Sequence, residues 1–580
     1  MDFNHILFFS DKDSENSYRL IFAEKPPENI LIFRPKGFSG LPNGLEEAAG
    51  SATISTHEVE SLSIDDSKEW IANEVQTKPH RALMDMFEGL KEAGFKENIV
   101  ISIFSGSKLH AALQLTFAMI IDASVQVIQG KPGQEQKVTS LDWLNGAMSA
   151  GTKKLQQGVL LGMLEAKCSE YSRHTSTQLA YSPENDGWLE AETIVGSQPP
   201  KTVPDTKGFS ATASAMSGAG LLETKSTPSS ENREQRYRLT GKGWITALSL
   251  WNERNESQLE TRYGRISGAM INPKSPNDLS IISIMNTLER VDCWVSIFGM
   301  HHDAGPVGMC MSSPSSGVTV PLDSETVATY QTALNTWNLA LTNQQVKHAH
   351  WAFYDAGQDT ESDFTALCEW MWPRLQGSSS DSTSWSFDIT QLLINTQLIP
   401  AVLFAQSAGL PMTYCLKRSG DSGPSGRNII RSKLGMRSHV LHMPNRDFLP
   451  VFTDNQTSNL QIKHRILLGL LHHDRVRQSQ IEDAVDALRD DPFGEIPENS
   501  QSMSRYRSYL ELKEFIDDEI SRSKLSEDYS LPSKPNAKHR QYLRSAQLIV
   551  SRQRPGQGAA EEMMLSPIGK LIALYIESKI

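Results

Sequence analysis

The chain has 580 residues, of which 39% are hydrophobic and 21% charged, a composition typical of a globular protein with about three to five domains. Its formal net charge of −12 excludes general affinity for nucleic acid, so any such contact needs a local basic patch. Five widely spaced cysteines, a start unlike a signal peptide and the lack of an apolar run of ~18–20 residues predict a cytoplasmic protein without disulfides or membrane helices.

Residues 1–135 alternate between apolar runs and a helical pattern, as in a parallel sheet with crossover helices. Strand-like runs occupy residues 6–9, 29–33, 97–104 and 125–128. The third run ends in a turn of small residues, Ser105-Gly106-Ser107-Lys108, before a helical stretch. Backbone N–H groups at the start of such a helix favour an anion such as phosphate. We therefore predict a Rossmann-like domain over residues 1–135.

Residues 150–265 are predicted to form a mostly helical domain that begins with a helix at 153–166 and contains a flexible insertion, 196–232, rich in small and polar residues. Residues 239–243 and 565–569 both read Leu-(Thr/Ser)-x-x-Gly, or nearly so, before an apolar helix. Thr240 and Ser566 are expected to cap these helices, with Pro567 in the first helical position. The pattern resembles the end of a winged helix-turn-helix, and a second such domain is predicted at 440–580.

Residues 280–418 repeat the order of the first α/β segment. An apolar run at 291–298 leads into a loop, a strand-like stretch follows at 349–354, and the run 385–390 precedes a helix that extends to residue 405. Residues 252–278 are predicted to be a linker. The matched spacing favours internal duplication. The predicted fold class is α/β, with two Rossmann-like domains, each followed by a winged-helix-like domain.

At the two strand–turn–helix units the sequence resembles the CARF domains of CRISPR-associated proteins, Rossmann-like folds that sense cyclic oligoadenylate. Their signature is a strand ending Asp-x-Thr-Gly-Gly-Thr-Lys. In the first copy, residues 105–108 match the Gly-Gly-Thr-Lys part, whereas Ser102 and Phe104 replace Asp and Thr. In the second copy, Asp388 and Thr390 match the front, whereas Gln391 stands where a glycine belongs.

The resemblance implies that two copies in one chain form a pseudo-dimer with one pocket at the carboxyl ends of the strands. The partner implied is a cyclic oligoadenylate, and neither a cofactor nor a metal is predicted. The ligand-binding residues expected are Ser10, Asp11, Ser105, Gly106, Ser107, Lys108, Asp388, Thr390 and Gln391.

Two further patterns are typical of nucleases, which often accompany tandem CARF domains. Asp205, Glu223 and Lys225 fit the letters of a metal-dependent PD-(D/E)xK site, although no strand alternation separates them. Arg465 and His472 lie seven positions apart and share a helix face, as in HEPN ribonucleases, but a leucine-rich core face explains this run equally well. We therefore favour a non-enzymatic protein.

The favoured function is a CRISPR-associated, type III-linked sensor or adaptor of antiviral defence that passes ligand or partner binding to its winged-helix domains. One alternative is a cyclic-oligoadenylate-activated nuclease. Another is a substrate of a CRISPR-guided protease, cleaved in the linker at Met436 and Arg437 to release a C-terminal signalling part. The overall acidity favours a protein partner of the defence system, and a basic stretch offers a DNA contact through Lys534, Lys538, Arg540 and Arg544.

Overall fold

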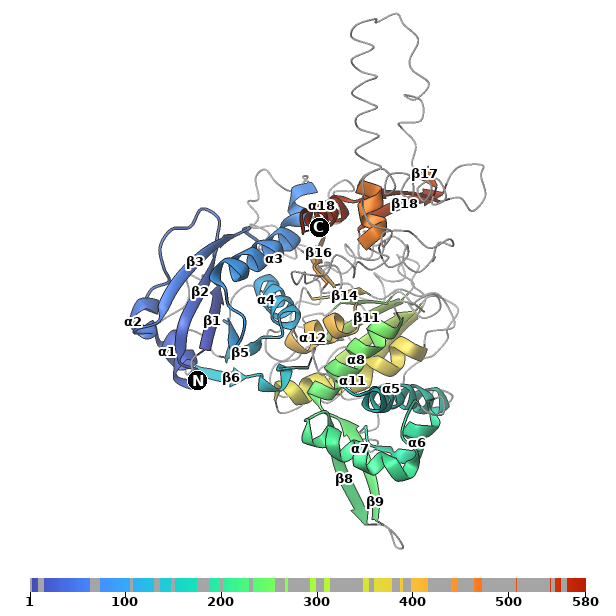
Figure 1. The fold of residues 1–580 in the computed structure, drawn as a ribbon. Coiled ribbons are helices and arrows are strands. Elements are labelled where there is room, and N and C mark those ends of the chain that lie inside the picture. Colours follow the sequence, from blue (N-terminus) through green and yellow to red (C-terminus); the bar gives the residue numbers. More distant parts are fainter. Residues whose placement is uncertain are drawn as a thin grey trace, which may run out of the picture. The chain divides into compact units, whose positions relative to one another are not determined.

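A computed structural model divides the chain into two compact units, Met1–Arg446 and Asp447–Ile580, and each is described by itself (Figure 1). The structure describes residues 3–8, 15–62, 73–104, 108–129, 136–147, 152–174, 187–198, 202–228, 233–255, 266–269, 293–298, 307–312, 348–353, 359–377, 386–389, 398–410, 412–415, 440–445, 464–471, 507–508, 543, 548–553 and 561–579. Among these residues, no helix is both long and apolar enough to cross a membrane.

The first sheet has six strands in the order β3-β2-β1-β4-β5-β6, of which only β6 runs antiparallel to its neighbour. Its central strands are apolar and buried on both faces, as parallel sheets covered by helices require. This arrangement confirms a mixed α/β fold with a mostly parallel sheet. The elements are β1 (Phe3–Phe8), α1 (Glu15–Glu24), β2 (Pro27–Pro35), α2 (Leu45–Ala49), β3 (Thr53–Val59), α3 (Asn73–Ala93), β4 (Ile99–Ile103), α4 (Lys108–Ile120), β5 (Ser124–Gln129), β6 (Lys137–Ser140) and the 3-10 turn η1 (Asp142–Leu144).

The second sheet has seven strands in the order β13-β12-β11-β10-β14-β15-β16. Strands β11, β10, β14 and β15 are parallel, whereas β12, β13 and β16 pair antiparallel with their neighbours. The elements are β10 (Ile266–Ala269), β11 (Cys293–Phe298), β12 (Val307–Ser312), β13 (His348–Phe353), α11 (Thr360–Gly377), β14 (Ser386–Asp388), α12 (Ile399–Ser407), β15 (Met412–Cys415) and β16 (Val440–Met443).

The two sheets share the order of five strands around a central strand, although β3 is parallel to β2 whereas β12 is antiparallel to β11. The strand that follows β1 or β10 in the chain lies on one side, while β4 or β14 lies on the other, and the last strand is antiparallel. In the second sheet β10, which lies inside the expected linker 252–278, takes the central place, and the expected opening run 291–298 contains its neighbour β11. Strand β10 is only four residues long, so it gives no apolar run to detect. The limits 280–418 also leave out β16.

A helical module, here called the α5–α8 module, lies between the two sheets in the chain. Its antiparallel sheet has the order β7-β9-β8. The stretch 196–232 is not simply a flexible insertion, because it contains α7 and β8: Asp205 caps α7, while Phe209 and Met216 are buried. The elements are α5 (Lys154–His174), β7 (Leu189–Glu190), α6 (Ala191–Gly196), α7 (Thr206–Gly218), β8 (Leu222–Pro228), β9 (Arg233–Leu239) and α8 (Gly241–Asn255).

The second unit contains a similar small sheet, with the order β17-β19-β18 and antiparallel pairing. A helical stretch at residues 464–471 precedes it in the chain. Pro567 is the first residue of the closing helix, as predicted from the sequence. The elements are β17 (Arg507–Ser508), β18 (Ile549–Gln553), β19 (Glu561–Leu565) and α18 (Pro567–Lys579).

Candidate functional site

Two of the predicted ligand residues, Lys108 and Asp388, are among the described residues. Lys108 begins α4 directly after β4, and Asp388 is the last residue of β14. Both strands, β4 and β14, lie next to the central strand of their sheet. Open α/β sheets bind ligands at the edge formed by the carboxyl ends of such strands. The remaining predicted ligand residues, Ser10, Asp11, Ser105, Gly106, Ser107, Thr390 and Gln391, lie outside the described residues.

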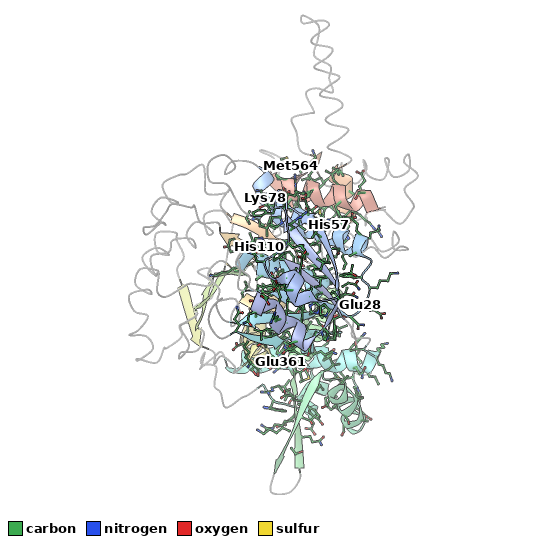
Figure 2. All side chains as sticks on the ribbon, turned by 90° about the vertical axis from the view of Figure 1, so that its left-hand side faces the viewer. Glu28, His57, Lys78, His110, Glu361 and Met564 are labelled. Carbon is green, nitrogen blue, oxygen red and sulfur yellow. The ribbon has the colours of Figure 1, made fainter. Side chains whose placement is uncertain are left out.

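Two further basic side chains belong to this edge of the first sheet. A helix that follows a parallel strand starts at the strand's carboxyl end, so Lys78 in α3 and His110 in α4 lie in early turns there. Figure 2 shows both side chains away from Glu28, which marks the amino end of β2. Burial lowers the pKa of His110 to about 4, so this imidazole is neutral at pH 7.

Helices α4 and α12 occupy the same place in the two sheets and pack against each other (Figure 1). The Gln406 side-chain amide of α12 donates to Thr116 Oγ1 of α4 and to the Pro444 carbonyl, each at 2.9 Å. The Gln406 and Thr116 side chains are fully buried. Contact between equivalent elements is the mark of an isologous interface.

Two further contacts join elements of the two sheets. Helix α3 of the first half packs on β16 of the second, where His80 and His442 are neighbours. Helix α11 precedes β14 in the chain as α3 precedes β4. It contacts the turn η1 after β6, where Trp143 stacks on Phe364 with ring centroids 5.4 Å apart. Elements of the first sheet therefore contact elements of the second at α4–α12, α3–β16 and η1–α11.

The buried histidines predict acid sensitivity. Burial lowers the pKa of His80 to about 3 and that of His442 to about 4 from an ordinary 6.5, so between these values the unfolded chain binds protons that the folded chain does not. We expect the free energy of unfolding to fall as the pH drops below about 6.5, by up to about 1.4 kcal/mol per pH unit for each histidine. Urea unfolding from pH 7.5 to 4.5 measures this, and a slope unchanged in His442→Gln would contradict it.

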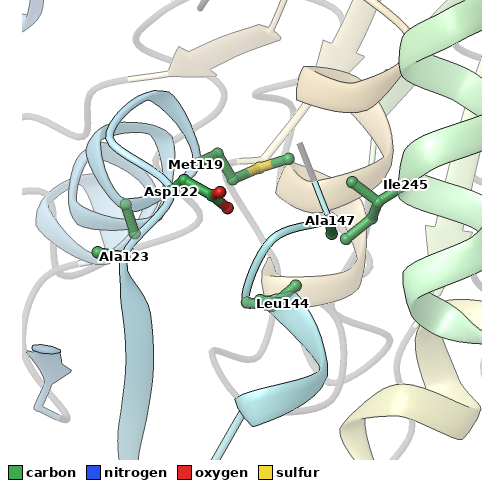
Figure 3. Close-up of a pocket in the computed structure, with 7 residues that line it drawn as sticks. Met119, Asp122, Ala123, Leu144, Ala147 and Ile245 are labelled. Carbon is green, nitrogen blue, oxygen red and sulfur yellow. The ribbon is translucent and has the colours of Figure 1, made fainter. Parts of the chain in front are cut away.

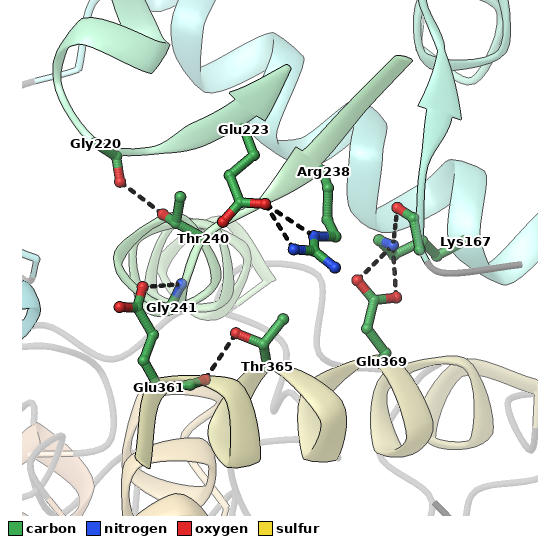
Figure 4. A network of polar contacts seen from close by, with 10 residues as sticks. Lys167, Gly220, Glu223, Arg238, Thr240, Gly241, Glu361, Thr365 and Glu369 are labelled. Carbon is green, nitrogen blue, oxygen red and sulfur yellow. Dashed lines mark hydrogen bonds and ion pairs between the residues drawn. The ribbon is translucent and has the colours of Figure 1, made fainter. Parts of the chain in front are cut away.

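A buried ion pair joins the α5–α8 module to α11 (Figure 4). Lys167 Nζ of α5 lies 2.7 and 2.5 Å from the two carboxylate oxygens of Glu369 and also donates to the Gly187 carbonyl at 2.9 Å. The side chains are only 4% and 9% exposed. Burial raises the pKa of Glu369, while Lys167 and then Arg238 favour the carboxylate.

Polar contacts continue from this pair to the start of α8. Arg238 of β9 pairs with Glu223 of β8 at 2.6 Å, and the Glu361 carboxylate of α11 accepts the Gly241 N–H at 2.9 Å. Burial raises the pKa of Glu361, and the nearby Glu223 charge adds to the rise. The sequence analysis missed this network. The only local signal was the spacing of Glu361, Thr365 and Glu369, which places them on one helix face.

The two small-sheet modules end in the same cap, as the repeated Leu-(Thr/Ser)-x-x-Gly pattern predicted. Thr240 Oγ1 accepts the Gly243 N–H at 2.9 Å, and Ser566 Oγ accepts the Gly569 N–H at 3.0 Å. The backbone N–H of Thr240 also donates to the carbonyl of Leu221, the residue before β8. In the same way, the N–H of Ser566 donates to the carbonyl of Leu548, the residue before β18.

The side chains of the predicted nuclease pattern have separate partners. Asp205 Oδ1 accepts the Gly208 N–H at 2.7 Å, Glu223 pairs with Arg238, and the Lys225 ammonium lies 5.8 Å from the Trp188 ring centroid. Among the described residues, no group of three or more His, Cys, Asp or Glu side chains is placed to hold a metal ion.

The other ribonuclease pattern is only half described. Arg465 lies in the helical stretch 464–471, while His472 lies outside the described residues. Both nuclease interpretations stay predictions.

One cavity lies between the end of α4, η1 and α8 (Figure 3). It is lined mainly by apolar side chains, including Met119, Leu144 and Ile245, and has a volume of about 10 Å³. That is room for about one water molecule, so this cavity is a packing defect and not a ligand pocket.

No protein-family profile matches the chain, and no curated protein does. Among solved structures, it is similar to Can2 from Sulfobacillus thermosulfidooxidans, solved in complex with cyclic tetra-adenylate, with 10% identity, a TM-score of 0.16 and coverage of 45% of this chain and 66% of that chain. It is also similar to protein VC1899 from Vibrio cholerae, with 8% identity, a TM-score of 0.16 and coverage of 70% and 93%. Likenesses this weak carry no argument about function.

Proposed function

We propose that the chain is a CRISPR-associated sensor or adaptor, in which two CARF-like domains form an internal pseudo-dimer that binds a cyclic oligoadenylate. The observation that carries this proposal is the strand order that the two sheets share, β2-β1-β4-β5-β6 and β11-β10-β14-β15-β16, together with the packing of the equivalent helices α4 and α12. In a two-fold dimer the same helix of each subunit meets its counterpart, and the contact between α4 and α12 has this form. The ligand would lie at the carboxyl ends of β4 and β14, with Lys108 and Asp388 among its contacts.

The output would pass through two winged-helix-like modules. The order helix, strand, helix, helix and two-stranded wing in the α5–α8 module supports this, as does the strand order β7-β9-β8. The second unit has the corresponding order β17-β19-β18 and the same closing cap.

The charge distribution of the α5–α8 module favours a protein partner over DNA. On the charged face of its sheet Arg236 and Arg238 pair with Glu190 and Glu223, so Lys225, opposite Arg236, adds only one further positive charge. The outer face of α7 carries small uncharged side chains, among them Ser210 and Ser214. A DNA contact through residues 534–544 stays a prediction, because Lys534, Lys538, Arg540 and Arg544 lie outside the described residues.

Calorimetric titration of the full chain with cyclic tri-, tetra- and hexa-adenylate tests the sensor function. We expect one of these ligands to bind, and Lys108→Ala to weaken its binding about tenfold or more, because a charge-assisted hydrogen bond contributes about 1.5–3 kcal/mol. Lys154→Ala, an exposed lysine at the start of α5, is the matched control and should bind as the wild type does. No heat of binding with any ligand would contradict the proposal.

A second candidate function is supported by the division of the chain into two units. The boundary after Arg446 lies close behind the predicted cleavage linker at Met436 and Arg437, which itself lies outside the described residues. Cleavage there would leave β16 attached to the C-terminal fragment, so release would require β16 to leave its partner β15. Incubation with an activated CRISPR-guided protease should then give two fragments; an intact chain would exclude this function.

A further inference from the structure

We propose that α11 is a coupling element, which ties the wing strands β8 and β9 to the second sheet through the buried Glu369–Lys167 pair. The kind of signal that reaches α11 rests on the proposed function. The mechanical link itself does not, because it follows from contacts within the first unit.

One face of α11 is fixed to two helices of the α5–α8 module. Glu361, Thr365 and Glu369 follow each other at intervals of four residues and therefore share a face. Glu369 forms the buried pair with Lys167 of α5, and Glu361 accepts the backbone N–H of Gly241, where α8 begins. The two carboxylates thus hold α11 at two points, about two turns apart.

Apolar and ring contacts fix the other parts of α11. The buried Trp372 indole donates to the Leu164 carbonyl of α5 at 2.8 Å and meets the Trp251 ring of α8 with centroids 4.9 Å apart. Near the start of α11, Phe364 stacks on Trp143. With both ends held, α11 moves as one rigid body with its neighbours or not at all.

The wing reaches Glu369 through Lys167. Lys167 Nζ also donates to the Gly187 carbonyl at 2.9 Å, and the ring of the next residue, Trp188, lies 4.9 Å from the Arg238 guanidinium of β9. Strand β9 pairs with β8 along its length, so this contact reaches both wing strands. Because a buried carboxylate that loses its cation remains without compensation, Lys167 should follow a shift of Glu369 and carry the contact with the wing along.

The other end of the link reaches the candidate ligand edge. Residues 378–385 alone separate α11 from β14, whose last residue is Asp388. Helix α11 also packs on α12, which carries Gln406 at the contact with α4. A displacement of β14 or α12 thus has a short route to α11.

Hydrogen–deuterium exchange of the full chain tests the coupling without any ligand. Gln406→Ala removes the two hydrogen bonds at the α4–α12 contact, and we expect exchange of the amides at 222–239 to rise about tenfold. In the double variant Lys167→Met/Glu369→Leu, which removes both charges and so should still fold, Gln406→Ala should leave this exchange unchanged. Ser55→Ala, which removes a hydrogen bond on the distant β3, is the matched control and should leave the wing unchanged.

Two results would overturn the coupling: wing exchange that does not respond to Gln406→Ala, or an equal response in the double variant. Cyclic tetra-adenylate provides a separate arm. If it binds, it should alter wing exchange in the wild type and not in the double variant, and an equal effect in both would also overturn the coupling. If none of the cyclic oligoadenylates binds, the proposed function fails, while the Gln406→Ala comparison still decides the coupling.

Discussion

Replacing Glu369 with alanine should lower the free energy of unfolding of the first unit by about 3–5 kcal/mol, because the substitution leaves the Lys167 ammonium buried without a counter-charge. The Lys167 side chain is 4% exposed, and it also donates a hydrogen bond to the Gly187 carbonyl. Water cannot replace the carboxylate at such a site without local opening. Urea unfolding followed by tryptophan fluorescence measures the loss, since Trp244 lies 5.5 Å from the ammonium.

The matched control removes both charges together. In Lys167→Met/Glu369→Leu no buried charge remains, so we expect a stability close to that of the wild type, in keeping with apolar replacements of buried pairs elsewhere. A double variant as unstable as Glu369→Ala would show that packing at this position, and not charge, sets the cost. A single variant as stable as the wild type would mean that the pair is not buried in solution.

The second large effect is expected at the glycine three residues after each cap residue, Gly243 after Thr240 and Gly569 after Ser566. A Cβ at Gly243 would lie 2.0 Å from the Leu221 carbonyl oxygen, and one at Gly569 would lie 1.9 Å from that of Leu548. Because both obstacles are backbone atoms, no rotamer change relieves the overlap. We therefore expect Gly243→Ala and Gly569→Ala each to destabilise its own unit by about 3 kcal/mol, at the upper end of the range for overpacking. Chemical unfolding measures both losses.

Gly218→Ala is the control for this pair. A Cβ at Gly218 meets nothing within 4 Å, and the residue lies at the end of α7. Alanine there should leave the stability unchanged or raise it by up to about 1 kcal/mol, because it restricts the unfolded chain. Equal losses in Gly218→Ala and Gly243→Ala would mean that helix context, and not the close carbonyl, explains the effect.

Sequence patterns predicted those elements whose cause is local. The run 97–104 contains β4, because its apolar residues are buried on both faces, and the caps at Thr240 and Ser566 follow from hydroxyl chemistry within one turn. Strand β10 was missed because its four residues, Ile-Ser-Gly-Ala, show no strand pattern of their own. They form a strand because β11 and β14 pair with them on either side.

The polar network at α11 was beyond local patterns for a different reason. Lys167 and Glu369 are 202 positions apart, so no periodicity links them, and each looks like an ordinary surface charge in its own helix. The stretch 196–232 misled in the opposite direction. Its small residues suggest disorder, yet two buried anchors, Phe209 and Met216, suffice to hold α7 once a partner surface exists.

The contact between α4 and α12 lies within a single chain, and this has a consequence for how the protein behaves at low abundance. Two separate subunits come apart on dilution, whereas tethered surfaces meet at an effective concentration that the linking chain sets. The pairing of the halves therefore persists at any copy number in a cell. In a homodimer every substitution appears in both subunits. Here a substitution in α4 leaves α12 unchanged, so the two surfaces can change independently.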